Sequence, residues 1–171
     1  MKKLIISLTL TLIVSITYAQ DFSVPERTIV QKHNRVVSLA YGNIIPGIAY
    51  AKSTGKTAEE YSAYVGDLFK TTWNRENGFN GLVNGFFSLF ESFRREQDLP
   101  MEILEQSDSK IVIKWKINYK YMFDDGPVNN VTYDEFNQWF EIVNMIIAEY
   151  FDATYEQKIT GDDWLVITIT K

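Results

Sequence analysis

Two pairs of adjacent carboxylates and one histidine are the side chains with the most direct capacity for chemistry. Asp124 and Asp125 lie in a turn-rich stretch, and Asp162 and Asp163 lie between the last two predicted strands. Two carboxylates that converge on a cleft can hydrolyse a bond by acid–base catalysis, and several such oxygens can hold a calcium ion. Neither pair shows the regular alternation of an ion-binding loop, so we interpret both as solvated turn residues. His33 lies beside the apolar face of a predicted helix, where a histidine with one hydrogen-bond partner is expected.

Other catalytic signatures are missing from the sequence. There is no cysteine, which excludes disulfides, thiol catalysis and cysteine metal sites. No GxSxG, HExxH, phosphate-loop or dinucleotide motif occurs. We therefore expect a non-enzymatic domain with no catalytic residue, no metal site and no cofactor. The alternative is a hydrolase in which some of Asp124, Asp125, Asp162 and Asp163 act together with His33.

Aromatic side chains are the best candidates for a binding function. They make up 15% of the chain, with 11 Phe and 10 Tyr, which favours an aromatic core or an apolar cavity. We expect either a small apolar or aromatic ligand, or a protein partner or homodimer that covers exposed Phe and Tyr. The candidate ligand-binding residues are Trp73, Tyr119, Tyr121, Trp139 and Trp164.

The first residues predict export. Lys2 and Lys3 form a basic start, and an apolar run from Leu4 to Ile16 follows. Thr17 and Ala19 are small at the two positions that a signal peptidase reads, so residues 1–19 are interpreted as a signal peptide of bacterial type, cleaved after Ala19. The run is short for a spanning helix, so we expect no membrane anchor after cleavage and a periplasmic or secreted protein. The net charge of −5 argues against nucleic-acid binding.

Four helices are predicted in the first half of the mature chain. Ser23 and Glu26 form a capping box before the first helix, which Gly42-Asn43 interrupts, and a second helix covers about residues 44–53. Gly55 is placed to end it in a left-handed conformation. A fourth helix starts near residue 82. The third helix, after the capping box at residues 57–60, is expected to place its large apolar residues on one buried face: Tyr61, Tyr64, Val65, Leu68, Phe69 and Trp73.

The spacing of apolar residues changes after residue 100, from the helical period to the alternation of a strand. Residues 101–106 and 110–117 predict two strands, and strict alternation in the second indicates one buried and one wet face. A capping box at Thr132 and Glu135 begins a long helix. Two strands, about 154–159 and 164–170, then flank a turn at Gly161-Asp162. We expect one α+β domain over residues 20–171, in the order four helices, two strands, one helix, two strands. The strands should form a four-stranded antiparallel sheet packed against the long helix.

Two stretches carry a resemblance to known families. They are Ile48 to Trp73, with Gly55-Lys56-Thr57 leading into a helix, and Ile111 to Ile169, where strand, polar loop, long helix and hairpin follow in order. This organisation resembles the aminothiazoline-carboxylate hydrolase-like families and the related vinyl-reductase-type ligand-binding domains. The resemblance implies a helix-covered sheet that holds a small apolar or aromatic ligand. Those families often carry cysteines before the long helix and in the last strand, where this chain has none, so a hydrolase of this type would use carboxylates instead.

Overall fold

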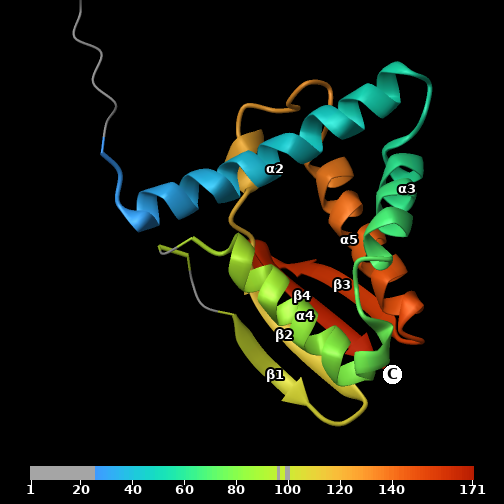
Figure 1. The fold of residues 1–171 in the computed structure, drawn as a ribbon. Coiled ribbons are helices and arrows are strands. Elements are labelled where there is room, and N and C mark those ends of the chain that lie inside the picture. Colours follow the sequence, from blue (N-terminus) through green and yellow to red (C-terminus); the bar gives the residue numbers. More distant parts are fainter. Residues whose placement is uncertain (1–25, 96, 99–100) are drawn as a thin grey trace, which may run out of the picture.

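The computed structural model describes residues 26–95, 97–98 and 101–171 and confirms the α+β class. The predicted signal peptide and Ser23 lie outside these residues. Short 3-10 turns η1, η2 and η3 cover residues 75–77, 120–123 and 161–163. The helices are α2 (Ile29–Ser53), α3 (Ala58–Lys70), α4 (Gly78–Phe93) and α5 (Tyr133–Tyr150), and the strands are β1 (Glu102–Gln106), β2 (Lys110–Lys116), β3 (Thr154–Thr160) and β4 (Trp164–Thr170). Figure 1 shows their arrangement.

Helix α2 is continuous where two helices were predicted. It runs without a break through Gly42-Asn43 and includes Pro46 in its interior. Thr28 and Gln31 form the capping box at its start. Val37, Tyr41, Ile45 and Ile48 are buried on one side of the helix, on both sides of the glycine in sequence. Burial of this row outweighs the roughly 1 kcal/mol by which an interior glycine disfavours a helix.

Helix α3 buries only part of the face that was predicted. Tyr61 and Val65 are partly buried against the core, but the fully buried residues are the small Ala58, Ser62 and Gly66, four positions apart. A Cβ built on Gly66 would lie 2.8 Å from Ile146 Cδ1 of α5, so the missing side chain lets α3 approach α5 closely. Tyr64, Leu68 and Phe69, which the pattern assigned to the core, are 62%, 55% and 48% exposed. Close helix packing through small residues therefore takes precedence over the larger apolar stripe.

The sheet is antiparallel with strand order β1-β2-β4-β3. The predicted alternation in β2 is confirmed, since every second residue of β2 and of β4 is buried. Ile113 lies opposite Ile167, and Trp115 lies opposite Leu165. These pairs face the helices. All five residues of the edge strand β1 are exposed.

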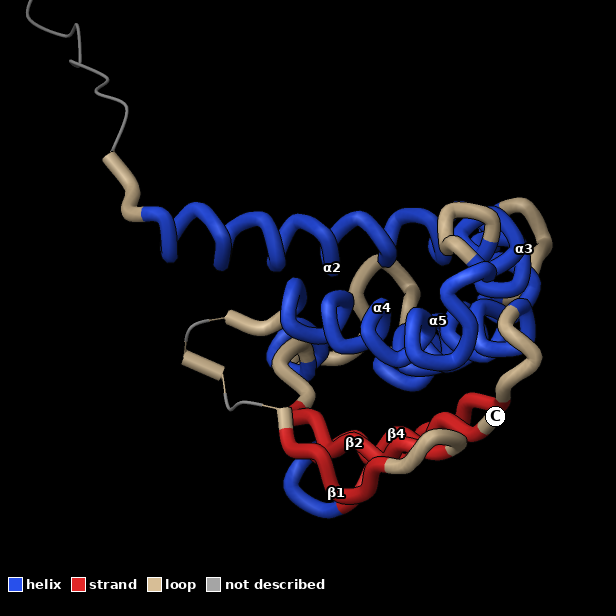
Figure 2. Tube along the Cα trace, turned by 60° about the horizontal axis from the view of Figure 1, so that its bottom comes forward, coloured by secondary structure: helices blue, strands red, loops and turns tan. Residues whose placement is uncertain are grey.

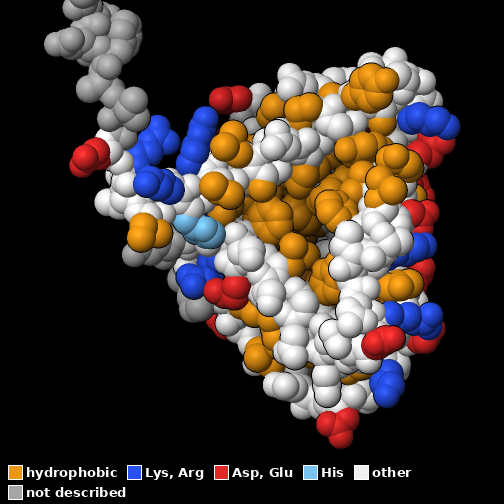
Figure 3. Space-filling view, viewed as in Figure 1, with side chains coloured by type: hydrophobic (Ala, Val, Ile, Leu, Met, Phe, Trp, Pro, Cys, Tyr) orange, Lys and Arg blue, Asp and Glu red, His pale blue; other side chains and the backbone are white. Residues whose placement is uncertain are grey.

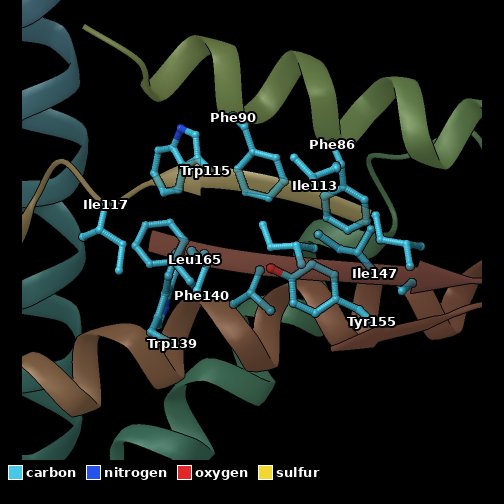
Figure 4. Packing of buried hydrophobic residues seen from close by; sticks show 14 of the residues in the cluster. Phe86, Phe90, Ile113, Trp115, Ile117, Trp139, Phe140, Ile147, Tyr155 and Leu165 are labelled. Atoms are coloured by element: carbon cyan, nitrogen blue, oxygen red, sulfur yellow. The ribbon is translucent and has the colours of Figure 1, made fainter. Parts of the chain in front are cut away.

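The helices form layers over one face of the sheet. Figure 2 shows α4 and α5 next to the sheet and α2 farther out, on the side of the molecule opposite the strands. Phe86 and Phe90 of α4 and Ile147 of α5 are almost fully buried. In Figure 4 their side chains meet those of the sheet between α4 and α5. Among the described residues, no helix combines the length and apolarity needed to cross a membrane.

Candidate functional site

A cavity of about 110 Å³ lies where α3, α4 and α5 converge. Its walls are almost entirely aromatic or aliphatic, and Asn144 is the one wall residue with an amide side chain. Figure 3 shows a hollowed apolar surface in this part of the molecule, between the helices labelled in Figure 1. The lining residues are Phe69, Trp73, Leu89, Phe93, Trp139, Phe140, Val143, Asn144 and Ile147.

Trp73 owes its position to a glycine on α4. It follows the end of α3, and its ring lies directly against Gly85, where a Cβ would come within 2.9 Å of Cε3 and Cη2. The same ring packs on Phe86 and Phe151, with centroid distances of 5.3 and 6.3 Å. Gly85 and Phe86 of α4, together with Phe151 at the end of α5, therefore fix the position of the indole ring.

The polar groups near the cavity belong to a buried network below it. Asn144 Nδ2 donates to Tyr155 Oη at 3.3 Å, and Tyr155 Oη donates to Gln157 Oε1 at 2.9 Å. Gln157 Nε2 in turn donates to the backbone carbonyl of Asn137 at 3.3 Å. These bonds hold the Asn144 amide at the cavity wall. Trp139 Nε1, on another wall residue, is buried with no acceptor among the described residues.

Burial keeps the tyrosines of this region neutral. Loss of hydration raises the pKa of Tyr155 well above its usual value, although the bond from Asn144 acts in the opposite direction. Burial is also the main reason why the pKa of Tyr119 lies far above its ordinary value. Neither hydroxyl can therefore serve as a base near neutral pH, and the cavity contains no charged group to polarise a bound molecule.

Two of the five residues selected from the sequence line the cavity, namely Trp73 and Trp139. Tyr119 is 1% exposed and lies deeper, where its Oη donates to Asn137 Oδ1 at 2.6 Å. Tyr119 lines a void of only about 10 Å³ inside the core, between α4, α5 and the sheet. The structure therefore gives Tyr119 a place in the core rather than at the cavity.

Tyr121 and Trp164 lie away from the cavity. Tyr121 is 48% exposed, and the Arg95 guanidinium lies 5.1 Å from its ring centroid. Trp164 begins β4 on the face of the sheet that the helices do not cover, and Lys114 Nζ lies 4.1 Å from its ring centroid. Both aromatic rings bind protein cations at the surface.

Several wall residues could not be distinguished from ordinary core in the sequence. Phe140, Val143 and Ile147 follow the same stripe on α5 that packs against the sheet. The available indication was Asn144, a polar residue inside that stripe, which is 2% exposed. A buried amide on an apolar face requires a specific partner, and here that partner is the hydroxyl of Tyr155 on β3, which does not itself line the cavity.

The carboxylates and His33 are not among the residues that line the cavity. Asp124 and Asp125 are exposed in the loop before α5, and Asp163 pairs with Lys120 at 2.6 Å. His33 is exposed, with Nε2 3.0 Å from the carbonyl oxygen of Arg94. That contact joins α2 to the end of α4. Within the described part of the chain, no three His, Asp or Glu side chains gather as metal ligands.

Comparisons with known proteins do not identify a family for this chain. No family model and no curated protein matches the sequence. Among solved structures, the chain is similar to a point mutant of the Fe(II) unliganded H-NOX protein from K. algicida, with 12% identity and a TM-score of 0.36. The match covers 88% of this chain and 76% of that chain. At this level of similarity it carries no argument about function.

Proposed function

We propose that the protein is an exported, non-enzymatic domain that binds a small apolar or aromatic molecule in the cavity between α3, α4 and α5. The observation that carries the proposal is the cavity itself, about 110 Å³ with aromatic and aliphatic walls. An engineered apolar cavity of about 150 Å³ in another protein stays dry and binds benzene, so a one-ring molecule is the right order of size. The resemblance to vinyl-reductase-type ligand-binding domains is consistent with this reading.

The walls favour a ligand that is largely apolar. Burying about 200 Å² of apolar ligand surface contributes about 5 kcal/mol at roughly 25 cal/mol per Å², which corresponds to a Kd on the order of 0.1–1 mM. The Asn144 amide supplies a polar contact, which fits a ligand with one hydrogen-bonding group. A charged ligand is disfavoured because no ionisable side chain lines the cavity.

The test is a titration followed by NMR with two probes of nearly the same shape, acetophenone and α-methylstyrene. Because Trp73 and Trp139 line the cavity and Trp164 does not, the indole N–H resonances of the first two should shift and that of Trp164 should not. A stronger response to acetophenone would identify an acceptor-bearing ligand. Absence of any shift in Trp73 and Trp139 with both probes would refute the proposal.

A cavity-filling variant supplies the specificity control. Val143 lines the cavity and is 5% exposed, so Val143→Phe should abolish the titration while the chain stays folded. Val112→Phe places the same change on the outer face of β2 and should leave binding unchanged. If Val143→Phe binds the probes as well as the wild type does, the probes occupy some other site.

Export is the second part of the proposal and has its own measurement. The mass of the protein recovered from the periplasm or medium should correspond to a chain that begins at Gln20. Recovery of the full-length chain from the membrane fraction alone would contradict export by a cleaved leader, without bearing on the cavity.

A further inference from the structure

We propose that the outer face of α2 docks on an anionic lipid surface. This inference is independent of the cavity and rests on the apolar and charged residues of one helix. Val37, Tyr41, Ile45 and Ile48 bury the inner side of α2. The outer side carries a second set of large apolar side chains: Ile29 is 84% exposed, Val36 61%, Leu39 49% and Tyr50 71%.

The exposed apolar residues share one face of the helix. At 100° per residue, Ile29, Val36, Leu39 and Tyr50 fall within a sector of about 80°, opposite the buried row. A helix that is apolar on both sides normally has both sides covered. Among the described residues, nothing from this chain covers the outer side, and the structure places α2 where a flat surface can reach it. Figure 2 shows α2 running along one side of the molecule, with the sheet on the opposite side.

Charge indicates what covers this face. Helix α2 contains Lys32, Arg35 and Lys52 and no acidic residue over its 25 positions, although the whole chain has a net charge of −5. Lys52 is paired with Glu135, whereas Lys32 and Arg35 project beside the exposed apolar row and Arg27 lies just before the helix. Figure 3 shows Lys and Arg side chains gathered around the N-terminal end of α2.

This combination fits an anionic bilayer better than a second copy of the chain. Pairing two α2 outer faces would leave Lys32 and Arg35 of each copy without a charge partner on the other helix, because α2 carries no acidic residue. At a lipid surface, aliphatic side chains enter the boundary between headgroups and acyl chains. The long stems of Lys and Arg allow their charges to remain among the anionic headgroups.

Vesicle co-sedimentation of the exported, processed protein tests the proposal. Partitioning should be strong on vesicles of equal parts phosphatidylglycerol and phosphatidylcholine, weak on phosphatidylcholine alone, and should fall as salt is raised. Each Lys or Arg near such a surface strengthens partitioning by about fivefold, so the double variant Lys32→Gln/Arg35→Gln should lower it by about 25-fold. The control Lys158→Gln/Lys171→Gln removes the same charge from the sheet side and should have little effect.

A second pair of variants tests the apolar contribution. Ile29→Ser/Val36→Ser changes only exposed positions and should weaken partitioning without reducing the helix content measured by circular dichroism. The proposal is overturned if the wild type binds anionic and neutral vesicles equally, or if Lys32→Gln/Arg35→Gln binds as the wild type does. Binding of an acidic protein that depends on Lys32 and Arg35, without vesicle binding, would overturn it in favour of a protein partner.

Discussion

Replacing Gly85 by alanine should displace Trp73 from the cavity wall. A Cβ at position 85 would overlap Cζ3 of the indole and lie 2.9 Å from both Cε3 and Cη2, whereas unstrained carbon atoms lie about 3.5–4.0 Å apart. The ring must withdraw by roughly 1 Å or more. It is held on its other sides by Phe86 and Phe151, so we expect an overpacking penalty of about 1–3 kcal/mol.

Gly42 provides a matched control inside α2. A Cβ built there meets nothing within 4 Å, so Gly42→Ala should show only the intrinsic helix preference of alanine. That preference is about 1 kcal/mol in favour of the folded state. The same gain partly offsets the overpacking at position 85, which leaves Gly85→Ala between neutral and about 2 kcal/mol less stable than the wild type.

Urea unfolding followed by tryptophan fluorescence measures both variants. The free energy of unfolding of Gly42→Ala should exceed that of Gly85→Ala by about 1–3 kcal/mol, a difference of several degrees in Tm. Gly85→Ala should also shift the indole resonance of Trp73 and weaken the binding of acetophenone. If the two alanine variants are equally stabilised, Trp73 does not lie on Gly85 and the cavity wall is held in some other way.

Three further outcomes are expected. Tyr119→Phe leaves the buried Asn137 Oδ1 without its donor and should lower the free energy of unfolding by about 1–3 kcal/mol, while the exposed Tyr121→Phe changes urea stability by less than about 0.5 kcal/mol. Burial raises the pKa of Tyr41, Tyr119 and Tyr155 above the usual 10.0. The contribution of these neutral tyrosines to the free energy of unfolding is therefore complete below pH 10 and is lost as pH rises further. The free energy of unfolding in urea should then fall with a limiting slope of about 1.4 kcal/mol per pH unit for each tyrosine, and a flat profile between pH 10 and 12 would contradict this. Partial burial acts to raise the pKa of Glu135, but Lys52 and the Thr132 amide hold that pKa below its ordinary value. Stability from Glu135 is therefore present above about pH 4.5 and lost at lower pH, so Lys52→Met should show a smaller loss of urea stability between pH 5 and pH 3 than the wild type does.

Local sequence patterns determined much of the fold. The capping boxes at Thr57 and Thr132 mark the starts of α3 and α5 as predicted, because capping depends on residues only three positions apart. The alternation in β2 identified its buried face, because successive strand residues point to opposite sides. Gly55, with φ of +82°, follows the end of α2 as its position suggested.

The candidate site depended on contacts between distant segments. The sequence selected aromatic residues without a means of grouping them, and the structure brings Trp73 and Trp139 to one cavity while it places Trp164 beyond the sheet. The signal for Asn144 was present, since a polar residue interrupts an apolar stripe. Its meaning required Tyr155, which reaches it from a different element.

Packing in the folded chain explains why α2 and α3 differ from their predictions. In α3 the larger apolar stripe lost to the small residues Ala58, Ser62 and Gly66, because these allow closer contact with α5. In α2 the predicted break at Gly42-Asn43 did not occur, because the buried row continues past it. The sequence by itself determined the strand and helix types and the absence of thiol chemistry, and the export leader stays a prediction. Only the tertiary structure decided which apolar surfaces are covered and where a cavity remains, because both depend on how closely helices far apart in the chain can approach one another.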